Sequence, residues 1–147
     1  MNMPALKFLI VEDEALLAMD MEAMIEDAGH EVAGECASLR EVQALPRDLA
    51  PDVAFVDLHL AEHSSGIDVC THIRSIWPDT MVVFVTGNPR KLPEDFAGGH
   101  GVLPKPFVRH DVFRIMQYLQ EGMANPPPHC KPPASFHASP GLAFAWA

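Results

Sequence analysis

Residues 52–60 read DVAFVDLHL, and this stretch decides how the rest of the chain is interpreted. Its apolar run, 53–56, contains β-branched and aromatic residues, a composition typical of a strand buried on both faces of a parallel sheet. Asp57 stands where that run ends. Ligands of open α/β sheets bind outside the carboxyl ends of the strands, so Asp57 is a candidate functional carboxylate. The alternative is an aspartate that only ends the strand and begins a turn.

The composition limits the kind of protein this can be. A chain of 147 residues is long enough for one domain with a hydrophobic core. Its formal net charge of −10 argues against binding to nucleic acid or anionic membranes, because both favour surfaces rich in Lys and Arg. Three widely spaced cysteines without a C-x-x-C pattern indicate reduced thiols. With no signal peptide and no apolar run of membrane-spanning length, we expect a cytoplasmic protein.

Four more apolar runs predict strands, and amphipathic patterns predict helices between them. The expected strands span 6–11, 31–37, 81–85 and 101–103. Helical periodicity appears at 17–28, 39–49, 69–77 and 108–119, with the second helix bent or shortened at Pro46. This alternation predicts an α/β fold, a doubly wound sheet of five parallel strands with helices on both faces.

Two segments depart from the alternation. Residues 88–101 contain two prolines and three glycines, which leave room for one poor helical turn at most, around 94–97. From residue 123 onward six prolines predict a polyproline-like or disordered tail. Although its end, 142–146, is apolar, we expect the tail to stay unpacked. The expected organisation is one domain over 1–122 and a tail over 123–147.

Polar residues follow the expected strands at the points where these end. They are Glu12 and Asp13 after the first strand, Asp57 after the third, Thr86 and Gly87 after the fourth, and Lys105 after the fifth. Parallel strands bring these ends to one edge of the sheet. Two carboxylates about 4 Å apart repel by roughly 4 kcal/mol at an effective dielectric near 20, so the cluster requires a cation. Mg²⁺ suits it, because this ion binds carboxylate and phosphate oxygens and keeps several waters.

The same edge has groups suited to a phosphoryl group. Lys105 supplies a point charge and Thr86 a hydroxyl for phosphoryl oxygens, while Gly87 leaves the backbone accessible. Asp57 is then a possible nucleophile that forms an acyl phosphate. The site would contribute mainly positioning and charge neutralisation.

The ordered set Glu12-Asp13, Asp57, Thr86 and Lys105-Pro106-Phe107 resembles the receiver domain of two-component response regulators, over residues 5 to about 121. The resemblance implies a (βα)5 flavodoxin-like fold with strand order 2-1-3-4-5. It implies that Asp57 is the phospho-acceptor, that Glu12, Asp13, Asp57 and the backbone carbonyl of His59 hold Mg²⁺, and that Thr86 and Lys105 bind the phosphoryl oxygens. The implied partners are a sensor histidine kinase or phosphotransfer protein and a downstream protein, the alternative output being a phosphate reservoir.

The chain departs from the common receiver pattern at one position. Receivers usually carry Tyr or Phe three residues before the Lys, as a rotameric switch coupled to the Thr, and this position is Val102 here. Residues 84–89 and the glycine-rich segment after them are similar to a branch of stand-alone receivers called FATGUY, which lacks that aromatic switch. We therefore expect ordering of residues 88–101 to replace it. We expect His59 and Asn88 to tune water access to an acyl phosphate from two sides.

Other functions remain open at this point. A phosphatase that turns over through an aspartyl-phosphate typically needs Asp-x-Asp, and His59 stands at the position of the second Asp. A receiver-like binding module that is never phosphorylated is disfavoured by the complete acidic site. Nucleotide binding is weaker still, since neither G-x-G-x-x-G nor G-K-[ST] follows the first strand. His59 and His63 lack further ligands at zinc spacing and are interpreted as loop histidines, and a metal role for His129, Cys130 and His137 is disfavoured because the tail is expected to be flexible.

Overall fold

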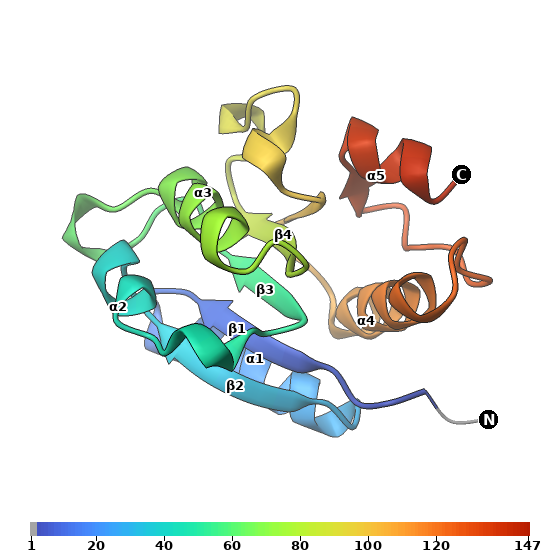
Figure 1. Ribbon diagram of the computed structural model, residues 1–147, viewed down its shortest axis with the longest axis horizontal. Coiled ribbons are helices and arrows are strands. Elements are labelled where there is room, and N and C mark those ends of the chain that lie inside the picture. The colour runs from blue at the N-terminus through green and yellow to red at the C-terminus, as the bar shows by residue number, and fades with distance from the viewer. Residues whose placement is uncertain (1–2) are drawn as a thin grey trace.

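The computed structural model describes residues 3–147, and its centre is one β-sheet (Figure 1). Within these residues the sheet has six strands in the order β2-β1-β3-β4-β5-β6. The strands are β1 (Lys7–Val11), β2 (Glu31–Cys36), β3 (Val53–Val56), β4 (Met81–Thr86), β5 (Gly101–Pro104) and β6 (His137–Ala138). The first five run parallel, and β6 pairs antiparallel with β5. The expected order 2-1-3-4-5 is present, but the prediction of five strands misses β6.

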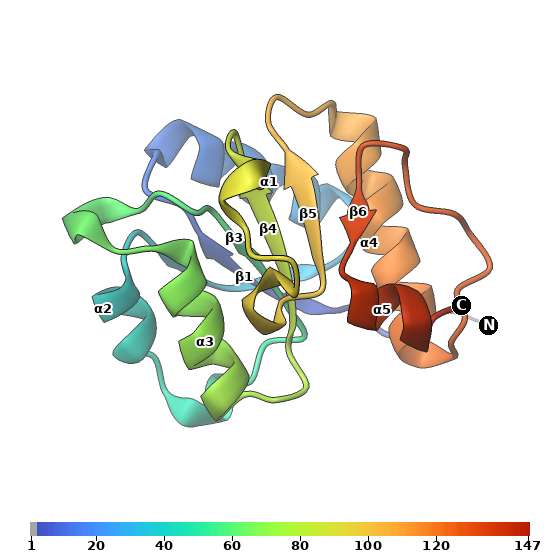
Figure 2. The ribbon, with the colours of Figure 1, turned by 90° about the horizontal axis from the view of Figure 1, so that it is seen from above.

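Helices cover both faces of the sheet. They are α1 (Ala15–Asp27), α2 (Leu39–Gln43), α3 (Gly66–Ile76), α4 (Arg109–Ala124) and α5 (Pro140–Ala145). Figures 1 and 2 show α2 and α3 on one face, and α1 and α4 on the other. This arrangement confirms the predicted doubly wound α/β fold. No helix in the described part of the chain is both long and apolar enough to cross a membrane.

The central strands are continuous apolar runs because both of their faces are covered. Every residue of β3 and β4 is buried. Successive side chains point to opposite faces, so Phe55 packs with α1 and α4 while its neighbour Ala54 packs with α2 and α3. Two hydrophobic cores result, one on each side of the sheet. This two-sided burial explains why strand periodicity is missing from the central run.

The second helix is as short as Pro46 predicted. The Ser38 hydroxyl accepts a hydrogen bond from the Glu41 amide at 3.2 Å, and the Glu41 carboxylate accepts one from the Ala37 amide at 3.1 Å. This reciprocal pair starts α2. The helix ends at Gln43, and after Pro46 only the 3₁₀ turn Arg47–Leu49 follows.

Residues 88–101 form two short 3₁₀ turns, Pro89–Lys91 and Phe96–Gly98, where one turn was expected. In the second turn Phe96, Ala97 and Gly98 have φ values of 56°, 53° and 87°, in the left-handed region. A helix cannot continue through such a run. Next to it, a Cβ on Gly99 would lie 2.7 Å from the Phe84 ring, so this glycine allows the segment to close against β4.

The prediction of an unpacked, disordered tail is wrong. Helix α4 extends to Ala124, and β6 and α5 follow it. Phe136 and Leu142 are buried in the same core as α1 and α4. The apolar contacts of these residues stabilise the segment despite the preference of its prolines for irregular structure. Pro140 occupies the first turn of α5, where a missing amide hydrogen costs nothing. The domain boundary at residue 122 remains a prediction.

Candidate phosphoryl-acceptor site

The candidate site lies at the carboxyl edge of the sheet, and main-chain hydrogen bonds fix the positions of two of its residues, Asp57 and Lys105. The Asp57 amide donates to the Val11 carbonyl at 3.0 Å, so the residue after β3 is held against the end of β1. The Lys105 amide donates to the Thr86 carbonyl at 2.8 Å, which holds the residue after β5 against the end of β4. The parallel register therefore delivers an acid and an amine to the same edge.

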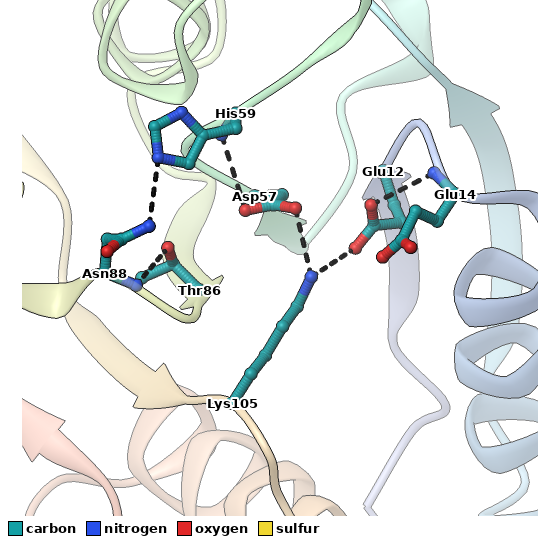
Figure 3. A network of polar contacts seen from close by, with 7 residues as sticks. All are labelled: Glu12, Glu14, Asp57, His59, Thr86, Asn88 and Lys105. Carbon is teal, nitrogen blue, oxygen red and sulfur yellow. Dashed lines mark hydrogen bonds and ion pairs between the residues drawn. The ribbon is translucent and has the colours of Figure 1, made fainter.

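Lys105 joins two of the predicted acids (Figure 3). Its Nζ lies 2.9 Å from Glu12 Oε1 and 3.0 Å from Asp57 Oδ2. The side chains of Lys105, Glu12 and Asp57 retain only 19%, 7% and 10% of their exposure to solvent. Ion pairs shielded from water in this way are stronger than exposed ones. The sequence predicted Glu12 as a metal ligand but gave no sign of its pairing with Lys105.

Burial and charge act against each other at this pair. Burial raises the pKa of Glu12 above its ordinary value, the ion pair with Lys105 opposes that rise, and the charge of Asp57 adds to it. Burial by itself would lower the pKa of Lys105, but the hydrogen bonds to Glu12 and Asp57 outweigh burial and raise it. Lys105 therefore stays charged at neutral pH.

Glu12, Asp13 and Asp57 form an acidic cluster whose closest carboxylate oxygens all lie within 4.8 Å of one another. Three carboxylates against one ammonium leave two negative charges without a partner in this group. Asp13 is exposed and opens the cluster to water, whereas Asp57 is buried. Hard oxygen donors with one side open to water suit Mg²⁺, which keeps part of its hydration shell. The residues present therefore fit the metal that the sequence predicted.

The other side of the site carries Thr86, Asn88 and His59. The buried Thr86 hydroxyl accepts a hydrogen bond from the Asn88 amide at 3.0 Å, and Asn88 Nδ2 lies 3.2 Å from His59 Nε2. The His59 amide makes a long contact of 3.4 Å to Asp57 Oδ1. His59 and Asn88 thus meet across the exposed mouth beside Asp57 (Figure 3). Gly87 is exposed, and a Cβ there would meet nothing within 4 Å.

Sequence reasoning missed Gly66, whose backbone packs directly against the main chain of Asp57 and Leu58. A Cβ at this position would lie 2.1 Å from the Asp57 carbonyl oxygen and 2.9 Å from the Leu58 Cα. Both are backbone atoms, so only glycine lets α3 begin this close to β3. The Ser65 hydroxyl caps the helix by accepting from the Ile67 amide at 3.1 Å. A serine followed by glycine at a helix start was the one available signal.

Comparison with known proteins decides the family. The family model of the response regulator receiver domain matches residues 8–117. This chain belongs to that family. The membership confirms the resemblance found in the sequence and identifies a domain of two-component signalling. Receiver domains are signalling domains, so the family does not favour the phosphatase or the unphosphorylated module.

This receiver domain is similar to proteins of different lengths. It is 35% identical over 89 residues to the phyllosphere-induced regulator PhyR of Methylorubrum extorquens, a match of 60% of this chain and 33% of that protein. It is 33% identical over 118 residues to the chemotaxis protein CheY of Thermotoga maritima, covering 78% of this chain and 98% of CheY. The crystal structure of the response regulator PhyR from Brucella abortus superposes with a TM-score of 0.68 at 34% identity, over 81% of this chain and 48% of that one. The match thus spans about a third of the length of the Methylorubrum extorquens PhyR and about half of the Brucella abortus PhyR chain.

Proposed function

We propose that this receiver domain accepts a phosphoryl group on Asp57 from a phosphohistidine of a sensor histidine kinase or phosphotransfer protein. The reaction depends on Mg²⁺, takes place in the cytoplasm, and changes the binding of a downstream protein. The observation that carries the proposal is Asp57 itself. Its carboxylate lies 3.0 Å from the Lys105 ammonium and inside the cluster formed with Glu12 and Asp13.

Asp57 is the nucleophile. A bond forms between its carboxylate oxygen and phosphorus while the bond from phosphorus to the donor imidazole nitrogen breaks, and the imidazole, which carries a proton on its other ring nitrogen, leaves as the neutral base. Glu12, Asp13, Asp57 and the His59 carbonyl would hold Mg²⁺, which neutralises charge on the phosphoryl oxygens. The residues themselves supply position and charge.

Lys105 has the capacity to bind the transferred group without leaving its partners. An ammonium carries three N–H donors, and two of them are directed at Glu12 and Asp57. The third is available for a phosphoryl oxygen. The Thr86 hydroxyl and the exposed backbone at Gly87 complete the proposed phosphoryl contacts from β4.

Residues 88–101 transmit the conformational change that follows phosphorylation, in place of an aromatic switch. Val102 is buried in β5 and has no ring that could rotate, whereas the neighbouring segment begins at Asn88, directly on the Thr86 hydroxyl. Movement of Thr86 toward a phosphoryl group breaks that bond and releases the start of the segment. The contact between His59 and Asn88 sets how easily water reaches the acyl phosphate.

The test is acid-stable, base-labile labelling by acetyl phosphate in the presence of Mg²⁺, measured by intact-protein mass spectrometry. We expect one phosphoryl group on the wild type and none on Asp57→Asn. Asp79→Asn, an exposed aspartate in a turn, is the matched control and should be labelled like the wild type. Equal labelling of Asp57→Asn and the wild type would reject the assignment.

A further inference from the structure

The loop between β3 and α3 folds into a small hairpin that carries His59. We name residues 58–65 the hairpin loop. His59 and Ser65 form an isolated antiparallel bridge, and the Leu60 amide donates to the Ser64 carbonyl at 3.2 Å. Figures 1 and 2 show the loop beside α2. The direction of the His59 carbonyl depends on the conformation of this loop, because a backbone group turns only with the chain that carries it.

The tip of the hairpin loop is strained. Glu62 and His63 have φ values of 60° and 57°, in the left-handed region that favours glycine. Two such residues in succession persist only where surrounding contacts hold them. The ion pair between Arg40 and Glu62 is too weak for that role, because the two side chains are 80% and 47% exposed. Contacts that are better shielded from water must therefore fix the shape of the loop.

Ser64 joins the hairpin loop to the start of α2. Its hydroxyl, on a half-buried residue, donates a hydrogen bond to the Ala61 carbonyl and accepts one from the Leu39 amide at 3.2 Å. Leu39 is the first residue of α2, so its amide has no partner within the helix. The Ala61 amide also donates to the Ala37 carbonyl at 2.9 Å. The loop and the N-terminus of α2 thus satisfy each other's polar groups.

The segment that leads into α2 also holds Glu12. The Glu12 amide donates to the Cys36 carbonyl at 2.9 Å, next to the residues that bind the hairpin loop. Residues 36–39 therefore connect two parts of the chain that carry proposed Mg²⁺ ligands, the Glu12 carboxylate and the His59 carbonyl. Ligands that come from separate segments keep their geometry only if those segments are fixed relative to one another.

We infer that Ser64 is a positioning residue for the His59 backbone carbonyl, a ligand that the proposed function assigns to Mg²⁺. The inference rests on the proposed function, since it requires Mg²⁺ at the acidic cluster. Ser64 acts through His59: its hydroxyl holds the hairpin loop against α2, so the carbonyl keeps its direction before the ion binds. Such coupling is reciprocal, so occupation of the metal site stabilises the loop and, with it, the hydrogen bond from the Leu39 amide.

The first test is an NMR titration of the full, unphosphorylated chain with MgCl₂, followed through the backbone amide of His59. Ser64→Ala removes the hydroxyl, so we expect the dissociation constant for Mg²⁺ to rise about tenfold or more, the usual effect of removing a group that orients a metal ligand. Ser64→Thr keeps a hydroxyl and should restore most of the affinity. Ser75→Ala removes an exposed hydroxyl that bonds to the His72 carbonyl within α3, and it should bind Mg²⁺ like the wild type.

Hydrogen exchange of the Leu39 amide separates positioning from a general loss of structure. Mg²⁺ should slow this exchange in the wild type and leave it unchanged in Ser64→Ala, where the acceptor is missing. A merely structural role for Ser64 would not make the exchange depend on Mg²⁺. Circular dichroism checks folding, and Ser64→Cys replaces Ser64→Ala if the latter does not fold.

The outcomes distinguish this inference from the proposed function. Wild-type Mg²⁺ affinity in folded Ser64→Ala would overturn the inference alone. So would equal weakening in Ser75→Ala, a failure of folded Ser64→Thr to restore the affinity, or an exchange rate at Leu39 that ignores Mg²⁺ in the wild type. A wild type that does not bind Mg²⁺ would overturn both the inference and the metal dependence of the proposed function.

Discussion

Substituting His100 by asparagine should make folding less sensitive to acid. His100 precedes β5, and its Nδ1 accepts a hydrogen bond from the Val82 amide at 2.9 Å, which requires an unprotonated nitrogen. Burial, together with the positive charge of Arg74, lowers the pKa of His100 from 6.5 to about 4. The oxygen of an asparagine side chain can accept the same bond but does not titrate. The variant therefore keeps the contact and removes the proton-binding group.

The sign and size of the effect follow from the two pKa values. Above pH 6.5 His100 is neutral in both the folded and the unfolded chain and does not change stability. Between pH 6.5 and about 4 the unfolded chain binds a proton that the folded chain does not, so stability falls as the pH falls. At about 1.4 kcal/mol for each pH unit, the loss reaches about 3 kcal/mol near pH 4.

Urea unfolding at pH 7 and pH 4.5 measures this directly. The free energy of unfolding should drop further in the wild type than in His100→Asn, by about 2 kcal/mol at pH 4.5, where the change is not yet complete. His110→Asn, an exposed histidine on α4, is the control and should follow the wild type. Equal losses in the wild type and His100→Asn would refute the reasoning that a half-buried neutral imidazole fixes the start of β5.

Two further comparisons test whether Gly66 is needed for the structure of the site and whether Thr86 transmits the phosphorylation signal. Gly66→Ala should lower the free energy of unfolding by more than about 2 kcal/mol in urea titrations, because its Cβ would meet the Asp57 backbone. The control Gly87→Ala, whose Cβ meets nothing, should change it by less than about 0.5 kcal/mol. Equal losses in the two variants would mean that Gly66 is not sterically required. In a partner-binding assay after phosphorylation, Thr86→Ala should impair the response more than Val102→Ala. The opposite order would contradict a switch that begins at the Thr86 hydroxyl.

The parallel sheet and the meeting of the acidic residues with Lys105 could be predicted from the sequence. Runs such as 53–56 and 81–85 are recognisable because burial on both faces removes polar residues from them. Once the strands are parallel, the residues that follow them must share an edge. This reasoning brings Glu12, Asp57 and Lys105 together without any knowledge of side-chain conformation.

The folding of residues 129–147 and the ion pairing inside the site could not be predicted. Proline counts describe the intrinsic preference of 123–147, whereas its folding depends on Phe136 meeting Gly101, a contact between distant parts of the chain. The Glu12–Lys105 ion pair likewise joins residues 93 positions apart and depends on side-chain geometry. Neither the Phe136–Gly101 contact nor the Glu12–Lys105 ion pair can be deduced from composition. Both are tertiary contacts, and in the C-terminal segment such contacts outweigh the local preference for irregular structure.

The most direct measurement of the central claim is to locate the phosphoryl group chemically. The wild type is treated with acetyl phosphate and Mg²⁺, reduced with borohydride, which converts an aspartyl phosphate to homoserine, and mapped by peptide mass spectrometry. The account predicts homoserine at position 57. Homoserine at another aspartate such as Asp13, or none at position 57 in a labelled protein, would contradict it.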